Sequence, residues 1–209
     1  MTNILIADNH PIIRLGMSVV FNSTEEFNLI NTVSSTEALF EAVDKKNPDI
    51  VILELDIPEI NGIAALRRLK RNHPKVKVLI YSAQSENVYA LSCIKAGAFG
   101  YLPKTARIDQ ILTALTQINQ GKIYLSAAIS ANIKNNASET DHQALFRKLS
   151  SREIEVLKLL SSGKKNKEVA EGLEINEKTV STYKARLMKK LNVTNIVDLL
   201  QQAQALELY

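Results

Sequence analysis

Residues Glu174–Val193 read EINEKTVSTYKARLMKKLNV and have the periodicity of an amphipathic helix. Asn176 is a good N-cap residue, because its side-chain oxygen can accept a hydrogen bond from a free backbone N–H at the helix start. Glu177 then places negative charge at the positive end of the helix dipole. At about 100° per residue the apolar side chains gather on one face. This face is predicted to pack on a protein core and contains Val180, Tyr183, Leu187 and Leu191.

The opposite face of this helix is small, polar and cationic. Between Lys178 and Val193 there are five cations and no acidic residue, whereas a merely solvated helix would more often pair Glu with Lys one turn apart. Short side chains on this face would let the floor of a DNA groove come close. Lysine and arginine would hold phosphates, and the groove face would read base edges. DNA contacts are predicted for Lys178, Thr179, Ser181, Thr182, Lys184, Ala185, Arg186, Lys189 and Lys190, with Lys184 and Lys190 flanking the groove towards phosphates.

Length and composition limit the number of domains and the kinds of partner that the chain can have. A chain of 209 residues suggests one domain or two small ones. From Lys148 onward there are 11 Lys and Arg against 8 Asp and Glu, and the rest of the chain has 15 against 14. The cationic C-terminal part suggests an anionic partner. The single cysteine, Cys93, excludes an intramolecular disulfide. Neither a signal peptide nor an apolar run of membrane-spanning length is present, so the protein is predicted to be cytoplasmic, with no membrane partner.

The first 121 residues alternate short apolar runs with amphipathic segments. Predicted strands are Asn3–Ala7, Asn28–Val33, Asp49–Leu53, Val76–Tyr81 and Gly100–Leu102. Predicted helices are Pro11–Asn22, Glu37–Lys46, Gly62–Asn72, Glu86–Ala96 and Ile108–Gln120. Five strand–helix units in this order predict an α/β fold, in which a parallel sheet is covered by helices on both faces.

Polar side chains follow four of these strands. Asp8 and Asn9 end the first strand, Glu54 the third and Ser82 the fourth, and Lys104 follows the fifth. Functional groups of such sheets gather at the carboxyl ends of the strands. Two carboxylates, a hydroxyl and an ammonium are therefore expected to converge on one edge.

Three segments at these strand ends resemble the receiver domains of response regulators. Pro48–Gly62 (PDIVILELDIPEING) resembles the phosphoacceptor region. Ile6–Pro11 (IADNHP) resembles the acidic-pocket motif, and Lys95–Lys104 (KAGAFGYLPK) the stretch with the aromatic switch residue and the lysine. In this family the acidic pocket binds Mg²⁺ and an aspartate accepts a phosphoryl group. A hydroxyl and an aromatic residue then reorganise the face formed by the fourth helix, fifth strand and fifth helix.

The resemblance implies a role for each strand-end residue. Asp8, together with Glu54, would be a metal ligand. Ser82 and Tyr101 would be the switch pair, and Lys104 the counter-charge of the phosphate. Each has a simpler alternative, since Ser82 could cap a turn, Tyr101 could belong to the core and Lys104 to the surface. Two further residues are predicted to be structural: His10 as a neighbour of Pro11 and not a ligand, and Cys93 as core.

Two positions depart from the receiver pattern. The register set by Pro58 and Gly62 puts Glu54, and not an aspartate, at the phosphoacceptor position. Asn9 stands where the family usually has a second acid, which removes charge from a pocket for Mg²⁺, an ion that depends on charged oxygen ligands. The receiver is therefore predicted to be phosphorylation-independent, with Glu54 as a partial phosphomimetic within reach of Lys104.

The C-terminal part is predicted to be all-α. Residues 122–147 are expected to be a linker, because Asn132–His142 is polar and nearly free of large apolar side chains; Ala144–Lys148 could add a helical turn. Residues 148–209 are expected to form a four-helix helix-turn-helix domain. Ser150 and Glu153 make a capping box for its first helix, and Thr194 is expected to cap its last helix.

The segments LSSREIEVLKLL (149–160), GKKNKEVA (163–170) and KTVSTYK (178–184) together resemble the LuxR-type DNA-binding domain. With the receiver, the whole chain outside the linker resembles a NarL/FixJ-type response regulator. The resemblance implies a bacterial two-component transcription regulator and not an enzyme. Its receiver would control dimerisation and promoter binding, with double-stranded DNA, a sensor histidine kinase and a second copy of the chain as partners. The stripe expected to dimerise, unless it only seals its own small core, is Ile196, Leu199, Leu200 and Ala203.

Another class of function stays open at this point. A receiver-like protein-interaction module could carry a basic domain that binds DNA only nonspecifically. Selection from random DNA sequences would discriminate, because only a specific regulator would yield a repeatable half-site. A flavin-binding enzyme on the same topology is disfavoured, because the chain has no candidate phosphate-binding loop after the first strand.

Overall fold

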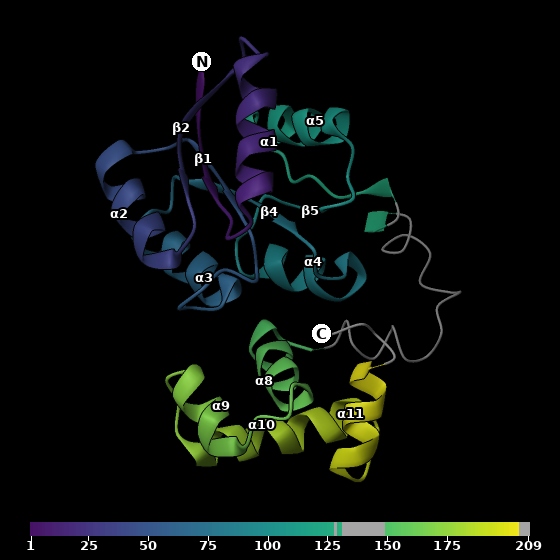
Figure 1. The fold of residues 1–209 in the computed structure, drawn as a ribbon. Helices are drawn as coiled ribbons and strands as arrows, with labels where there is room; N and C mark the ends of the chain where they lie inside the picture. The colour runs from purple at the N-terminus through teal and green to yellow at the C-terminus, as the bar shows by residue number, and fades with distance from the viewer. Residues whose placement is uncertain (128, 131–148, 205–209) are drawn as a thin grey trace. The chain divides into compact units, whose positions relative to one another are not determined.

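The computed structural model describes residues 1–127, 129–130 and 149–204 (Figure 1). Two parts of the chain are described separately: a unit built on a β-sheet, and a unit whose described elements are all helices. Most of the predicted linker, with the helical turn expected at Ala144–Lys148, lies outside the described residues.

A five-stranded parallel sheet forms the centre of the first unit. Its strands lie in the order β2-β1-β3-β4-β5, and each is parallel to its neighbours. The strands are β1 (Thr2–Ala7), β2 (Phe27–Val33), β3 (Ile50–Leu53), β4 (Lys77–Ser82) and β5 (Gly100–Pro103). All four residues of β3 are buried, as expected of a central strand that is covered on both faces. The predicted α/β fold is confirmed.

Four helices connect the strands, and a fifth follows β5. They are α1 (Pro11–Asn22), α2 (Thr36–Lys46), α3 (Gly62–Asn72), α4 (Glu86–Lys95) and α5 (Ile108–Asn119). Helices α1 and α5 cover one face of the sheet, where Met17, Phe21 and Leu115 pack on Ile4 and Ile6; α2 and α3 cover the other face (Figure 1). Every predicted strand and helix of this unit is present, and each end agrees within one residue.

The loop between β3 and α3 is held at both ends. At Gly62 a Cβ atom would lie only 2.5 Å from the Leu55 Cα, so only glycine fits. Glu59 has a left-handed backbone (φ +78°) and its Oε2 accepts hydrogen bonds from the Glu37 N–H (2.8 Å) and the Thr36 hydroxyl (3.0 Å) at the start of α2. The Glu37 hydrogen bond outweighs burial and lowers the pKa of Glu59. This loop directly follows Glu54.

The α/β unit continues beyond its predicted end at residue 121. The Tyr124 N–H donates to the Phe99 carbonyl (2.8 Å), and Tyr124 bridges to Gly100 beside β5. Its side chain packs against the same core as α1 and α5. The first residues of the predicted linker therefore belong to the sheet unit.

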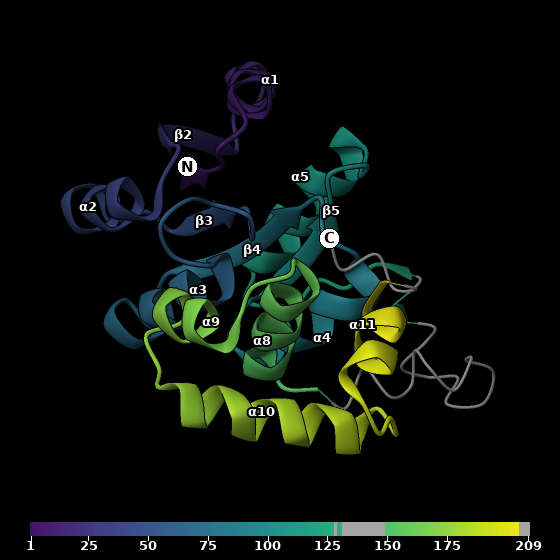
Figure 2. The ribbon, with the colours of Figure 1, turned by 60° about the horizontal axis from the view of Figure 1, so that its bottom comes forward.

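The described part of the second unit contains four helices: α8 (Ser151–Ser161), α9 (Asn166–Gly172), α10 (Glu177–Lys190) and α11 (Ile196–Gln204). Helix α10 runs across α8 and α9, with α11 near its C-terminal end (Figure 2). The core between them contains the fully buried Ile154, Leu157, Val180, Leu187 and Leu199. Among the described helices of the whole chain, none combines the length and apolarity that a membrane crossing requires.

Two of the three predicted helix starts in this unit are confirmed. Ser150 and Glu153 form the capping box, and the Asn176 Oδ1 accepts from the Thr179 N–H (2.8 Å). The prediction for Thr194 is wrong, because Asn195 caps α11: its Oδ1 accepts from the Asp198 N–H (2.9 Å). Threonine and asparagine are both good N-cap residues, so the sequence does not show which of these two neighbouring residues caps the helix.

Candidate acidic site and nucleic-acid interface

The polar strand-end residues of the α/β unit converge as predicted. Asp8 follows β1, Glu54 follows β3, Ser82 ends β4 and Lys104 follows β5. The Lys104 ammonium lies 2.8 Å from Asp8 Oδ2 and 2.7 Å from Glu54 Oε2. Both carboxylates are buried, and the Lys104 side chain is only 12% exposed. One cation is therefore paired with two buried acids, and buried charges are tolerated when they are paired in this way.

Both oxygens of Glu54 are engaged. Its Oε1 accepts hydrogen bonds from the backbone N–H groups of Leu55 (2.6 Å) and Asp56 (3.1 Å), and the Ser82 hydroxyl also donates to it. Its Oε2 pairs with Lys104. Glu54 thus contacts, at the same time, the hydroxyl that the receiver resemblance assigns to the switch pair and the lysine that it assigns to the phosphate.

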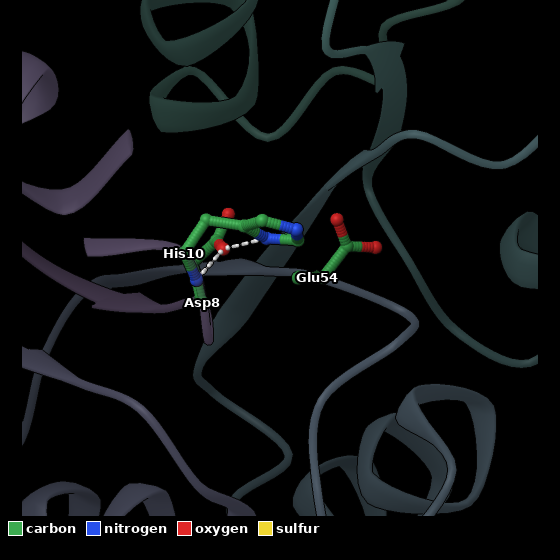
Figure 3. A group of neighbouring side chains, drawn as sticks. All are labelled: Asp8, His10 and Glu54. Atoms are coloured by element: carbon green, nitrogen blue, oxygen red, sulfur yellow. Dashed lines mark hydrogen bonds and ion pairs between the residues drawn. The ribbon is translucent and has the colours of Figure 1, made fainter. Parts of the chain in front are cut away.

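His10 is part of this cluster, which the sequence reasoning missed. Its backbone N–H donates to Asp8 Oδ1 (2.8 Å), which turns the ring back onto the same carboxylate. The ring Nδ1 lies 2.9 Å from Asp8 Oδ1 and 2.9 Å from Lys104 Nζ. Figure 3 shows the imidazole reaching from Asp8 towards Glu54. A histidine two positions after a strand-end aspartate was the available signal, because a carboxylate often binds the backbone two residues on.

Asn9, Tyr101 and Tyr81 surround the cluster. The Asn9 Oδ1 is buried and has no hydrogen-bond partner among the described residues. Tyr101 is fully buried on β5; its role in switching stays a prediction. The Tyr81 hydroxyl donates to the Lys104 carbonyl (3.3 Å). Burial raises the pKa of Tyr81, with Lys104 opposing the shift, so this phenol stays protonated and supports the backbone of Lys104.

In the helical unit, α10 divides into the two predicted faces. Val180, Leu187 and Leu191 are buried, and Tyr183 is half-buried. The opposite face is open to solvent and contains Lys178, Ser181, Thr182, Ala185, Arg186 and Lys189. The amphipathic character of the helix is confirmed, whereas the contacts of these side chains with DNA stay predictions.

Lys190, which is predicted to contact a phosphate, has a partner inside its own unit. Its Nζ lies 2.7 Å from Glu153 Oε2, and the Glu153 side chain is buried. Burial alone would raise the pKa of Glu153, but hydrogen bonds from Lys190 and Ser150 outweigh it and lower the pKa. Lys190 therefore ties α10 to the start of α8. Lys184 and Thr179 are half-buried, and the Thr179 hydroxyl donates to the Asn176 cap (2.8 Å).

The apolar stripe of α11 mostly closes its own core. Leu199 and Ala203 are fully buried, and α11 packs on α8 and α10. A partner cannot reach these two side chains, so the alternative of a sealed core holds for them. A dimerisation role stays a prediction only for the half-buried Ile196 and Leu200.

Comparisons with known proteins match both units. Residues 4–116 match the response regulator receiver domain, and residues 147–203 match the luxR family of bacterial regulatory proteins. A putative transcriptional regulator of Pseudomonas aeruginosa is 34% identical over 208 residues and is covered completely, as is this chain. The oxygen regulatory protein NreC of Staphylococcus epidermidis is 31% identical, over 96% of this chain and 95% of that protein. Among solved structures, RcsB of Salmonella enterica bound to a promoter is similar, with a TM-score of 0.81, 24% identity, and coverage of 97% of this chain and 98% of that one.

Proposed function

The chain is a two-component response regulator of the NarL/FixJ type. We propose that it regulates transcription and that Glu54, and not phosphorylation, determines the activity of its receiver. The observation that carries the proposal is the pair of contacts from Glu54 to Ser82 and Lys104. A glutamate has one charge and two oxygens, against nearly two charges and three terminal oxygens for a phosphoryl group. The mimicry is therefore partial, and we expect DNA binding without a phosphodonor.

Phosphoryl transfer to Glu54 is expected to be slow for a geometric reason. The extra methylene displaces the carboxylate by about 1.5 Å relative to an aspartate, and an error of about 1 Å can cost on the order of 10²-fold in rate. Both Glu54 oxygens are also already engaged by donors or by Lys104. Sensor histidine kinases are the general partners of receivers; this receiver would accept little phosphoryl from one.

Mg²⁺, which receiver domains commonly bind, fits this donor set poorly. The ion prefers an octahedron of oxygen ligands and gains from negative charge. Here Asp8 and Glu54 supply carboxylates, but the Lys104 ammonium is already paired with both of them. Asn9 offers a neutral amide where an acid is usual. We expect weak binding of Mg²⁺, so no step of the proposed function depends on this ion.

The exposed face of α10 would enter the major groove. Lys178, Arg186 and Lys189 supply charge there, and the short Ser181, Thr182 and Ala185 allow close approach to base edges. Lys184 would bind a phosphate at the rim. We expect Lys190 to contribute little to this surface, because its ammonium pairs with Glu153.

Two copies are expected to bind together on half-sites about one helical turn apart. Dimers on DNA occur in solved structures of RcsB. In this chain α1 offers a pairing surface: Ile12, Leu15 and Val19 are 77%, 63% and 63% exposed on one side. The only charged residue of α1, Arg14, donates to the Asp8 carbonyl (2.6 Å). Such an uncharged face can meet its own copy across a two-fold axis without opposing like charges.

The deciding experiment compares the DNA affinities of wild type, Glu54→Asp and Glu54→Gln, each with and without acetyl phosphate and Mg²⁺. Wild type should bind without the phosphodonor and gain little from it. Glu54→Gln should bind more weakly, because it loses the charge that pairs with Lys104. Glu54→Asp should acquire a response if the remaining pocket is competent. Stoichiometric, acid-labile phosphorylation of the wild type with a large gain in affinity would overturn the proposal.

Sequence-specific binding is tested separately from switching. Selection from a random DNA pool should yield a repeatable half-site. A pool that stays random after selection would instead favour a protein-interaction module with nonspecific DNA affinity.

A further inference from the structure

We propose that Arg152 is a positioning residue that determines how sharply α10 discriminates between DNA sequences, although it does not itself contact DNA. This role rests on the proposed binding of α10 in the major groove. Arg152 lies in the first turn of α8, and its guanidinium reaches the turn that leads into α10.

The guanidinium of Arg152 joins α8 to the segment between α9 and α10. Its Nη2 donates to the carbonyl oxygen of Leu173, the C-cap residue of α9. Its Nη1 donates to Glu155 Oε2 (2.7 Å). The Glu155 side chain is fully buried, and that of Arg152 is only 22% exposed. Both terminal nitrogens of the guanidinium are engaged within the helical unit, so we expect Arg152 to make no contact with DNA.

The turn that Arg152 holds is short and determines where α10 begins. Glu174 has a left-handed backbone (φ +52°), and Asn176 already caps α10. A carbonyl at the end of a helix, such as that of Leu173, has no partner within its own helix. A charged donor gives such a carbonyl a strong and directional hydrogen bond. Arg152 therefore fixes this turn relative to α8.

The opposite end of α10 is tied to the same turn of α8. Lys190, the last residue of α10, pairs with Glu153 (2.7 Å), the neighbour of Arg152 in the sequence. Between the two ends Val180 and Leu187 are fully buried, but apolar packing has no preferred direction. The polar contacts at its two ends therefore determine the angle of α10 on the helical unit.

A small change in this angle is sufficient to affect base readout. Helix α10 has 14 residues and is therefore about 21 Å long. If the Arg152 contact is lost while Lys190 stays paired, a swing of about 3° displaces the first turn of α10 by about 1 Å. Hydrogen bonds to base edges require donor–acceptor distances of about 2.7–3.2 Å, whereas lysines hold phosphates as point charges on flexible stems. Loss of Arg152 should therefore reduce discrimination between bases and leave the attraction to phosphates unchanged.

The test compares full-length wild type, Arg152→Lys and Arg152→Met in titrations with the DNA site obtained by selection and with random DNA, at several salt concentrations. Lysine keeps the charge but lacks the planar fork that bonds two acceptors. In both variants the ratio of the two affinities should fall about tenfold, as when one base contact is lost, while the salt slope stays that of wild type. Arg107→Lys is the matched control, because its guanidinium pairs with Asp109 at the surface of the α/β unit (3.0 Å).

Two results would overturn this role of Arg152 and leave the proposed function intact. An unchanged affinity ratio in Arg152→Lys would show that Arg152 contributes only to stability or holds a phosphate through its charge. A salt slope that falls by about one in Arg152→Met would identify Arg152 as a phosphate contact. A wild type that selects no site would overturn the proposed function, and the role of Arg152 with it.

Folding of both variants is checked by circular dichroism. Arg152→Met removes the cation that pairs with the buried Glu155, and such a loss can be strongly destabilising. If Arg152→Met does not fold, Arg152→Lys decides alone, because a phosphate contact would tolerate lysine and the two-acceptor contact would not.

Discussion

Lys104 is the residue on which the buried charges of the α/β unit depend. Removing one partner of a buried ion pair costs about 3–5 kcal/mol, because the other charge stays buried and unpaired. We therefore expect Lys104→Ala to lower the free energy of unfolding by several kcal/mol in urea denaturation followed by circular dichroism. Lys45→Ala is the control, since its partner Glu41 (3.1 Å) is also exposed and such pairs contribute about 0–1 kcal/mol. Equal effects of the two substitutions would contradict the proposed role of Lys104.

Glu153 gives the helical unit a dependence on acid. Its pKa in the folded protein lies below the ordinary 4.5, because the hydrogen bonds from Lys190 and Ser150 outweigh burial. The ionised carboxylate therefore stabilises the fold fully above about pH 4.5, and this contribution disappears as the pH falls through the lower folded value. Thermal unfolding of wild type and Glu153→Gln should differ most at neutral pH and converge in acid. A difference that stays constant down to acid pH would refute this assignment.

The sequence identified those site residues whose place follows from the strand order. Asp8, Glu54, Ser82 and Lys104 were found because the carboxyl ends of parallel strands share one edge. His10 was missed because its position depends on a local turn, in which its N–H returns to Asp8. The Lys190–Glu153 pair joins residues on two helices, and no local pattern signals such a contact.

At the scale of elements, two glycines are expected to respond in opposite ways. A Cβ at Gly62 would collide with backbone atoms of Glu54 and Leu55, whereas one at Gly16 in α1 would meet nothing within 4 Å. Gly62→Ala should cost at least about 1–3 kcal/mol, as overpacking does. Gly16→Ala should stabilise by about 0.5–1 kcal/mol, because alanine is the better helix former. Chemical denaturation of both variants measures the difference; a tolerated Gly62→Ala would show that the loop after Glu54 can shift.

The exposed face of α1 is expected to mediate self-association. Leu15→Glu puts a charge in the middle of this face, so two copies would oppose like charges. Sedimentation should show a weaker dimer, and footprinting a loss of paired half-site protection, with the unfolding midpoint unchanged. Ile123→Glu, at another exposed apolar position, is the control. Unaltered association of Leu15→Glu would exclude α1 as the pairing surface.

Helices and strands of the α/β unit were predictable because each shows a clear hydrophobic period between turn residues. The predictions that were wrong concern the ends of helices and of the α/β unit. Asn195 and not Thr194 caps α11, a choice between two good capping residues. Tyr124 joins the edge of the sheet, beyond the end of the unit predicted from the sequence. This residue was missed because a single bridging residue has no periodicity to detect.

At the scale of the whole molecule, two lysines of α10 should affect DNA binding differently. Lys184→Ala should weaken binding to all sequences alike and reduce the salt slope by about one, as the loss of a phosphate contact does. Lys190→Ala should leave the slope unchanged and lower the thermal stability of the helical unit, because it breaks the pair with Glu153. Titrations at several salt concentrations, with melting curves, separate the two outcomes. A reduced salt slope in Lys190→Ala would show that Lys190 contacts DNA.

The contacts from Glu54 to Ser82 and Lys104 also have a consequence for timing. A phosphoryl group can be hydrolysed within the life of the protein, but a side chain cannot be removed. A regulator whose activating charge is one of its own side chains has no inactive state to which hydrolysis could return it. Its activity then depends on its concentration. Promoter occupancy would then follow synthesis and degradation of the protein. If two copies bind together, occupancy at low abundance rises with the square of concentration, so a modest change in expression would produce a sharper change in output.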